Sequence, residues 1–424
     1  MSEPISISLP KTDRPQVLYQ ATLIACALVL LVNSYELTFA IWFLCAGLTL
    51  RRTYSLSFAR LLLILVAIIA VAFISSLFRE FQAFKFFRDL AYLMKPILGL
   101  LIGYNFCRIL GKKALTTIIY AGLALAVIHV STLIFYYVFG GIKNMNALRH
   151  LGGYFDDLEV YVLILLIFRK KLAIDISPKI AKAALLIVAV SSFLYFARTN
   201  ILQFLILFVA MKGYLRLTKR SLRVVAILAV SVIAAYTAIY QSNPRRGGKG
   251  LEAFLYKIKI APIEPFKTKI NEDDWKDFND NYRSFENIIT VRQVTGAGWP
   301  TTFFGKGLGS TIDIGREMWT NDEEYIRYIP TLHNAYMSVF LKAGLVGVLL
   351  TIIFIYYLFR HTRSYDEQIR HYNYILVGSA VYLILSNWVF MGLYLKLDNK
   401  SIVLGALLCY RGILIKQSEA KGNE

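Results

Sequence analysis

Long and nearly uninterrupted apolar runs dominate this chain, and short polar turns separate them. A helix that crosses a bilayer needs roughly 20 apolar residues, because about 30 Å of hydrocarbon is crossed at about 1.5 Å per residue. The ranges 58–78, 114–139 and 335–359 each reach that length. The pattern therefore predicts an all-α, polytopic transmembrane helix bundle of about twelve spans. The predicted spans lie near 17–33, 36–50, 58–78, 89–107, 114–139, 158–174, 181–197, 199–215, 222–241, 333–359, 372–395 and 400–416.

Composition agrees with a membrane protein, since 57% of the residues are hydrophobic and only 17% are charged. Ordinary soluble domains are less apolar and more highly charged. The polar first sixteen residues contain no apolar stretch of the kind found in a cleavable signal peptide. We therefore expect the first span itself to direct insertion.

The formal net charge of +20 would suggest a nucleic-acid partner in a soluble protein. Here the basic residues gather in alternate loops, for example 51–52, 169–182 and 212–223, whereas the short loops between them hold few. Cytoplasmic loops of membrane proteins carry such an excess of Lys and Arg. The charge therefore indicates topology, with both termini in the cytoplasm, and no nucleic-acid partner is expected.

One connection is far longer than the others and divides the chain into three parts. Residues 1–241 hold the first nine predicted spans, 242–332 form the long loop, and 333–424 hold the last three spans and a cytoplasmic tail. By the alternation of sides the loop is extracytoplasmic. It is balanced in charge and rich in apolar residues, so we expect it to fold with short helices against the membrane face. Long loops in compact proteins are usually functional or disordered, and the aromatic content favours a functional one.

His333 stands where the long loop ends and the tenth span begins, in the run Thr-Leu-His-Asn-Ala-Tyr. A neutral imidazole at this position could accept a proton from a hydroxyl nucleophile. The alternative is an interfacial histidine that lies among lipid headgroups without a chemical role. Its neighbour Asn334 could serve as a helix cap instead of a catalytic partner.

A glycine-rich turn, Phe-Gly-Lys-Gly-Leu-Gly-Ser, lies in the same loop at 304–310. Alternating glycines allow backbone N–H groups to approach an anion closely. A simple turn is the alternative interpretation of Gly305, Gly307 and Gly309.

Several cations lie at or near the same predicted face of the membrane. Arg198 stands between two apolar runs, and its planar fork suits phosphate or carboxylate, although snorkelling to the interface would also explain it. Arg283 and Glu286 have helical i,i+3 spacing, which would also let them pair with each other. Arg292, nine residues beyond Arg283, could reach the same site.

Charged residues also enter the predicted spans. Lys342 lies inside the tenth span and should point to a polar interior, because a charge facing lipid is costly. Arg88, Asp89 and Lys95 flank or enter the fourth span, and the first two could neutralise each other.

The order of these motifs is more specific than any one of them. Arg198 comes first, then Arg-x-x-Glu at 283–286, the glycine-rich turn at 304–310, and His-Asn-x-Tyr at 333–336 before an apolar helix with two glycines. This order resembles the O-antigen ligase/polymerase family of bacterial envelope enzymes. The likeness covers the topology of the whole chain, but at motif level it is confined to Arg198 and 283–347. Lys342 departs from the pattern, because family members often place an acidic or neutral residue there.

The resemblance implies a metal-independent glycosyltransferase without a cofactor, in the bacterial inner (cytoplasmic) membrane. Its donor would be a glycan on undecaprenyl diphosphate, presented at the periplasmic face. His333 would then be catalytic, and Arg198 with Arg283 or Arg292 would bind the diphosphate, since arginines stabilise the charge that develops as the anomeric C–O bond breaks. The residues expected to support the site are Glu286, Gly305, Gly307, Gly309, Asn334 and Tyr336.

Three functions remain open at this point. A polymerase would join lipid-linked repeat units of a cell-surface polysaccharide, with a chain-length regulator as a possible partner. A ligase would transfer the glycan to the lipid A–core acceptor of lipopolysaccharide. A flippase or transporter of lipid-linked oligosaccharide is the alternative from a different class, but it would place its polar groups near the bilayer midplane.

Overall fold

The computed structural model describes residues 16–80, 82–142, 145–153, 156–215, 218–246, 248, 251–262, 264–271, 273–319, 325–360, 366–396 and 398–422. Within these ranges every predicted span overlaps a helix. These helices are α1 (Gln16–Leu28), α2 (Tyr35–Leu48), α3 (Leu56–Ser76), α4 (Ala83–Leu110), α5 (Lys113–Val138), α7 (Asp157–Ile167), α8 (Pro178–Leu194), α9 (Arg198–Met211), α10 (Lys219–Gln241), α15 (Ala335–Phe359), α16 (Glu367–Val389) and α17 (Lys400–Gly422). The short helices η1 (Val29–Val32), α6 (Met145–Gly152) and η3 (Gly392–Tyr394) lie between them.

Six helices in the described part of the chain are long and apolar enough to cross a bilayer: α3, α4, α5, α10, α15 and α17. Three more apolar helices are shorter, among them α2 and α9. The structure thus supports a helical membrane protein, while the number of twelve spans stays a prediction.

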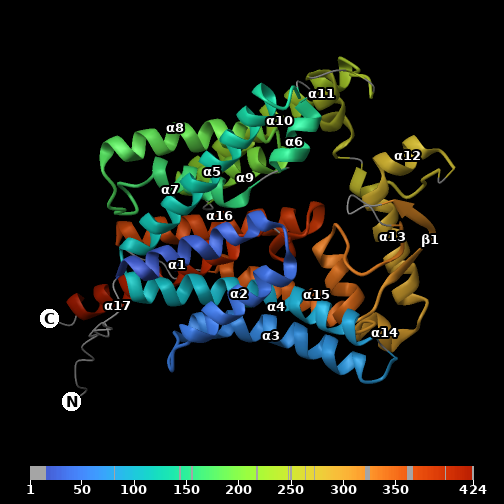
Figure 1. Cartoon of the computed structure of the whole chain (residues 1–424), viewed down its shortest axis with the longest axis horizontal. Coiled ribbons are helices and arrows are strands. Elements are labelled where there is room, and N and C mark those ends of the chain that lie inside the picture. The colour runs from blue at the N-terminus through green and yellow to red at the C-terminus, as the bar shows by residue number, and fades with distance from the viewer. Residues whose placement is uncertain are drawn as a thin grey trace.

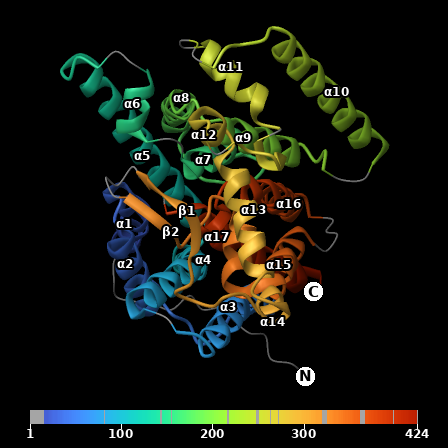
Figure 2. The same ribbon diagram turned by 90° about the vertical axis from the view of Figure 1, so that its right-hand side faces the viewer.

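Helix α10 shows most directly why this fold needs lipid. Its most apolar stretch is not buried inside the protein at all. Figure 2 shows α10 standing apart from the rest of the bundle, with α11 beside it. A helix that is apolar all round is stable only when protein or hydrocarbon covers it. The bilayer is the environment that supplies this cover.

The centre of the bundle is formed by α4, which packs along α17. Glycines allow the two backbones to approach closely, as is typical of helix packing in membranes. A Cβ atom on Gly103 would lie 1.9 Å from the Ile402 carbonyl oxygen, and one on Gly405 would lie 2.2 Å from the Leu100 oxygen. Helices α15 and α3 pack beside this pair. The bundle therefore offers a rigid base for the loop above it.

The long loop is folded. It contains α11 (Leu251–Ile260), η2 (Glu264–Phe266), α12 (Trp275–Asp280), α13 (Tyr282–Thr295), α14 (Trp299–Phe304), β1 (Ile312–Trp319) and β2 (Tyr325–Ile329). The short helices were expected, but the antiparallel hairpin of β1 and β2 was not; the described chain is otherwise helical, which fits the all-α prediction. Ile312 and Ile314 of β1 alternate with less buried residues, and both lie on the buried face of the hairpin.

The folded part of the loop has its own small core, which joins it to the start of α15. Phe278, Phe285 and Val294 pack there with isoleucines of the hairpin and with Phe340 of α15. In Figure 1, α12, α13, α14 and β1 lie at one end of the bundle, and α17 ends at the opposite end. Figure 2 shows α13 and the hairpin in front of the helix ends.

Helix α15 is interrupted at Gly344, whose φ of 62° and ψ of −160° are not helical. The break leaves the carbonyls of Leu341 and Lys342 without their usual partners four residues ahead. The backbone N–H groups of Lys306 and Gly307 bond to these two oxygens at 2.7 and 3.0 Å. The glycine-rich turn is therefore locked onto the broken helix.

Candidate functional site

The structure brings His333 and Glu286 together, although 47 residues separate them in the sequence. The His333 Nδ1 atom lies 2.9 Å from one Glu286 oxygen and 3.1 Å from the other, and the His333 backbone N–H donates to the same carboxylate at 3.2 Å. The Glu286 side chain is only 2% exposed, whereas that of His333 is 49% exposed. A buried carboxylate thus holds one edge of an imidazole whose other edge is open.

This arrangement determines which imidazole nitrogen can act. An ionised carboxylate only accepts hydrogen bonds, so Nδ1 must carry the proton that it donates to Glu286. In the neutral imidazole Nε2 is then the acceptor, and the carboxylate also stabilises the imidazolium that forms when Nε2 takes a proton. The pair is therefore suited to general-base catalysis on a hydroxyl group.

Tyr282 packs against His333 of the His333–Glu286 pair. Its ring meets the His333 ring edge-on, with 5.9 Å between the centroids and an interplanar angle of 84°. Burial, followed by the nearby Glu286 carboxylate, raises the pKa of Tyr282. The phenol is therefore neutral at physiological pH and does not compete as a base.

Arg283 lies on the same helix as Glu286. The i,i+3 spacing allowed these two residues to pair, but Arg283 pairs elsewhere. Its guanidinium is 3.5 Å from Glu264 of η2 and lies over the Phe390 ring, 5.9 Å from the ring centre. Phe390 directly follows α16. Arg283 therefore lies where η2, α13 and the end of α16 meet, and its salt bridge at 3.5 Å is loose enough to exchange for a stronger anion.

The two other candidate arginines lie elsewhere. Arg292 lines a polar cleft of about 530 Å³ together with Lys269 and Asn271. Nine residues make two and a half turns of an α-helix, so Arg292 faces away from Arg283. Arg198, the first residue of α9, donates a hydrogen bond to a backbone carbonyl of α11. The structure thus does not gather the three arginines at one point.

The glycine-rich turn uses its N–H groups within the protein. Gly305 donates to the Thr301 carbonyl at 2.8 Å, and Gly309 donates to the Asp89 carboxylate at 2.8 Å. A Cβ atom on Gly307 would lie 2.6 Å from backbone nitrogen of α3. All three glycines have positive φ, near 80°. The turn therefore does not offer its N–H groups to an external anion, because the anion bound here is the Asp89 side chain. The interpretation of these glycines as a simple turn fits better.

Asn334 and Tyr336 support the start of α15. The Asn334 side chain caps the helix by accepting the Met337 N–H at 3.2 Å, as the capping interpretation predicted. The Tyr336 hydroxyl donates to the Ile384 carbonyl of α16 at 3.4 Å. Both residues therefore fix the helix that follows His333.

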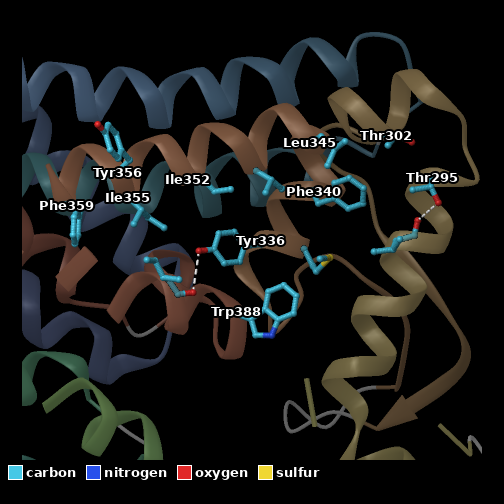
Figure 3. A pocket seen from close by; sticks show the side chains of 14 residues that line it. Thr295, Thr302, Tyr336, Phe340, Leu345, Ile352, Ile355, Tyr356, Phe359 and Trp388 are labelled. Atoms are coloured by element: carbon cyan, nitrogen blue, oxygen red, sulfur yellow. Dashed lines mark hydrogen bonds between the residues drawn. The ribbon is translucent and has the colours of Figure 1, made fainter. Parts of the chain in front are cut away.

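An apolar groove of about 850 Å³ begins three residues beyond His333 and follows α15. Figure 3 shows Phe359 at one end of the groove, Tyr336 and Trp388 near its middle, and Thr295 and Thr302 at the other end. Beyond the break at Gly344, from Leu345 to Phe359, the helix rises by roughly 21 Å at about 1.5 Å per residue, which is about two thirds of the bilayer hydrocarbon thickness of about 30 Å. The groove is apolar along its length and can hold a hydrocarbon chain, and one of its lining residues, Tyr336, lies three residues beyond His333.

Beneath the glycine-rich turn lies a buried ion pair that the sequence did not reveal as a pair. The Lys342 ammonium is 2.5 Å from Asp89, and both side chains are at most 2% exposed. Lys342 also donates to the Ser310 carbonyl, and Arg88 lies 3.2 Å from the second Asp89 oxygen. The expected polar surroundings of Lys342 are thus an aspartate of α4 and the loop itself. The only signal in the sequence was the presence of charged residues in two apolar runs.

Among the residues that the structure describes, no group of three or more His, Cys, Asp or Glu side chains could hold a metal ion. The expectation of metal-independent chemistry without a cofactor stays a prediction.

Neither a family model, nor a curated protein, nor a solved structure matches this chain. The fold and the site therefore define the protein only as a helical membrane protein with a folded loop and a carboxylate–histidine pair at one end of the bundle. The likeness to the O-antigen ligase/polymerase family rests on the order of the motifs.

Proposed function

We propose that this protein is a membrane glycosyltransferase that polymerises repeat units of a cell-surface polysaccharide. Its donor is a glycan on undecaprenyl diphosphate at the periplasmic face of the bacterial inner membrane. The observation that carries the proposal is the pairing of the exposed His333 imidazole with the buried Glu286 carboxylate; His333 lies three residues before Tyr336, which lines an apolar groove.

The chemistry follows from this placement. The acceptor hydroxyl gives its proton to His333 Nε2 as its oxygen attacks the anomeric carbon of the donor. The bond between that carbon and the diphosphate oxygen breaks, and the lipid diphosphate leaves with the electron pair. Glu286 stabilises the imidazolium. Arg283 lies on α13 about one turn before Glu286 and would exchange Glu264 for the diphosphate.

The apolar groove supports the lipid part of the donor. A polyprenyl chain lying along α15 would hold the diphosphate at the membrane surface, beside the residues that act on it. Arg198 and Arg292 have no assigned part in this step, because one contacts α11 and the other faces a separate cleft. Both termini are assigned to the cytoplasm in this proposal, with the loop in the periplasm.

The ligase alternative uses the same donor and differs only in its acceptor, the lipid A–core. Supplying purified protein with lipid-linked repeat units, with or without lipid A–core, distinguishes the two. Longer glycans on the lipid carrier indicate a polymerase, whereas glycans on lipid A–core indicate a ligase.

One observation favours the transporter alternative, namely charged side chains deep in the bundle. Lys400 lies 2.6 Å from both Asp157 and Asp398, and all three are buried. Charges inside membrane helices often mark a transport path. In sealed vesicles a flippase would move the lipid-linked glycan between leaflets without lengthening it.

The experiment combines both readouts in vesicles that contain the purified protein. We expect His333→Gln to abolish glycan transfer while the protein still folds, and His371→Gln at the far end of α16 to leave transfer unchanged. Full transfer by the His333 variant, or leaflet exchange without any transfer in the wild type, would show that the proposed function is wrong.

A further inference from the structure

A second polar pocket, of about 400 Å³, lies between the end of α3 and the glycine-rich turn. Its charged lining residues are Arg79, Glu80 and Lys306, and the backbone around Ser310 closes one side. Helix α14 separates this pocket from the apolar groove, because Thr301 of α14 bonds to Arg79 whereas its neighbour Thr302 lines the groove. The pocket is therefore distinct from the candidate active site.

Two cations are held in this pocket close enough to affect each other. Lys306 is half-buried, and among the described residues its ammonium group has no ion-pair partner. Burial, followed by the charge of Arg79, lowers the pKa of Lys306. Like charges that face one cavity repel, and an anion placed between them removes the repulsion. The pocket is thus electrostatically suited to an anion.

The protein fixes the Arg79 guanidinium and the backbone that carries Lys306. The Lys306 backbone N–H is bonded to α15, and Gly307 fits so closely against α3 that a side chain there would clash with Ser76. The Arg79 guanidinium donates to the Thr301 hydroxyl. A site built in advance binds without the cost of ordering flexible side chains.

Exposed aromatic side chains lie on the elements that form the pocket and on α14 beside it. Phe78 is 83% exposed, Trp299 is 76% exposed, and Phe304 is 51% exposed. Phe78 and Phe304 adjoin Arg79 and the turn in sequence. Exposed aromatics at the ends of membrane helices lie at the level of lipid headgroups. The cations therefore lie where headgroup phosphates lie, with apolar contacts available for the chains below.

We propose that this pocket binds the phosphate of an acidic phospholipid with a single negative charge, such as phosphatidylglycerol. Arg79 and Lys306 contribute two positive charges and Glu80 one negative charge, so the pocket carries a net charge of one. That balance matches a phosphodiester better than a doubly charged phosphate. The acyl chains lie against Phe78 and Trp299. The site would anchor the tip of the α3–α4 hairpin and α14 to the membrane, independently of the proposed reaction.

The test measures lipid binding to the purified full-length protein. Native mass spectrometry, and the midpoint of thermal unfolding in detergent, are recorded with phosphatidylglycerol, phosphatidylcholine or inorganic phosphate. We expect phosphatidylglycerol alone to be retained and to raise the midpoint. Lys306→Gln should weaken its binding about tenfold, the size of one hydrogen bond to a charged group. Lys306→Arg should retain binding, and Lys276→Gln on α12 should bind as the wild type does.

Three outcomes would overturn the proposal. Equal retention of phosphatidylcholine would show that charge does not select the lipid. Equal protection by inorganic phosphate would indicate a soluble anion as the ligand. Unchanged retention by the Lys306→Gln variant, with the same unfolding midpoint as the wild type in the absence of lipid, would show that the lipid binds elsewhere.

Discussion

Replacing Glu286 by glutamine tests whether the histidine–carboxylate pair is the general base. The substitution keeps the shape of the buried side chain and one acceptor oxygen, but it removes the negative charge 2.9 Å from His333 Nδ1. The amide NH₂ group also offers a donor where the imidazole needs an acceptor. The glutamine variant should therefore disfavour both the active tautomer and the imidazolium.

The size of the effect follows from these contacts. A hydrogen bond to a charged group contributes about 1.5–3 kcal/mol. Loss of the buried counter-charge as the imidazolium forms adds to this, so the barrier to transfer should rise by about 2–4 kcal/mol. At about 1.4 kcal/mol per tenfold, the rate should fall by roughly 30- to 1000-fold. The donor lipid does not contact Glu286 in the proposal, so KM for the donor should hardly change.

The assay is the rate of glycan transfer by purified protein in vesicles, with the unfolding midpoint recorded for each variant. Glu252→Gln is the matched control, since this carboxylate of α11 is half-exposed and contacts Arg245 at 3.7 Å, away from His333. A Glu286→Gln variant that folds normally and transfers within about threefold of the wild-type rate would refute the reasoning, because the effect of removing this charge is predicted to be at least tenfold larger.

Three further predictions concern stability. Lys342→Met should lower the free energy of unfolding by about 3–5 kcal/mol, because it leaves Asp89 buried without its main partner, and adding Asp89→Leu should restore part of the loss. If Asp89→Leu instead lowers the unfolding midpoint of the Lys342→Met variant further, the prediction of a partial rescue is wrong. Gly344→Ala should be strongly destabilising, since its Cβ would lie 2.3 Å from backbone of Phe303, whereas Gly412→Ala in open space should be neutral or stabilising. A hydrogen bond from Lys267 lowers the pKa of Asp277 below its ordinary value of 3.8. The ionised Asp277 carboxylate therefore contributes fully to loop stability above pH 3.8, and this contribution is lost as the pH falls through the lowered pKa. Hydrogen exchange of 267–277, corrected for intrinsic rates, should show this loss in the wild type but not in Asp277→Asn.

The positions of the helices could be predicted from the sequence because length and apolarity alone determine where a chain can enter lipid. Each apolar run overlaps a helix within the described residues. The break at Gly344 could not be predicted in this way, because it depends on a loop about forty residues earlier that supplies the missing hydrogen bonds. Local sequence shows a glycine in an apolar helix and nothing more.

The site was predicted in part. The sequence singled out His333, and Glu286 entered the prediction through its spacing from Arg283 and as a supporting residue that the family resemblance implies. Their contact joins a loop end to α13, and no local pattern encodes such a pairing. The placement of Arg292 away from Arg283 could have been expected, because a spacing of nine residues places two side chains on opposite faces of one helix.

The hairpin was also visible in principle. Ile312 and Ile314 alternate with polar residues and are both buried, which is the pattern of a half-buried strand. The strand is short and lies in a loop that was assigned to helices because the rest of the chain is helical. Its role is to close the small core behind α13, the helix that carries Glu286.

The buried charges that raise the transporter alternative are paired with one another, and this pairing fits a rigid bundle better than one that moves. A transport path needs polar groups that water or substrate can reach from each side in turn. Asp157, Lys400 and Asp398 instead bind each other across α7 and α17, and Lys95 of α4 donates to the Leu395 carbonyl at 2.7 Å. A pair satisfied in this way costs several kcal/mol to separate, which opposes the rocking of one half of a bundle against the other. The exposed imidazole of His333 lies outside this network, at the end of the bundle, where a substrate can reach it without any such movement.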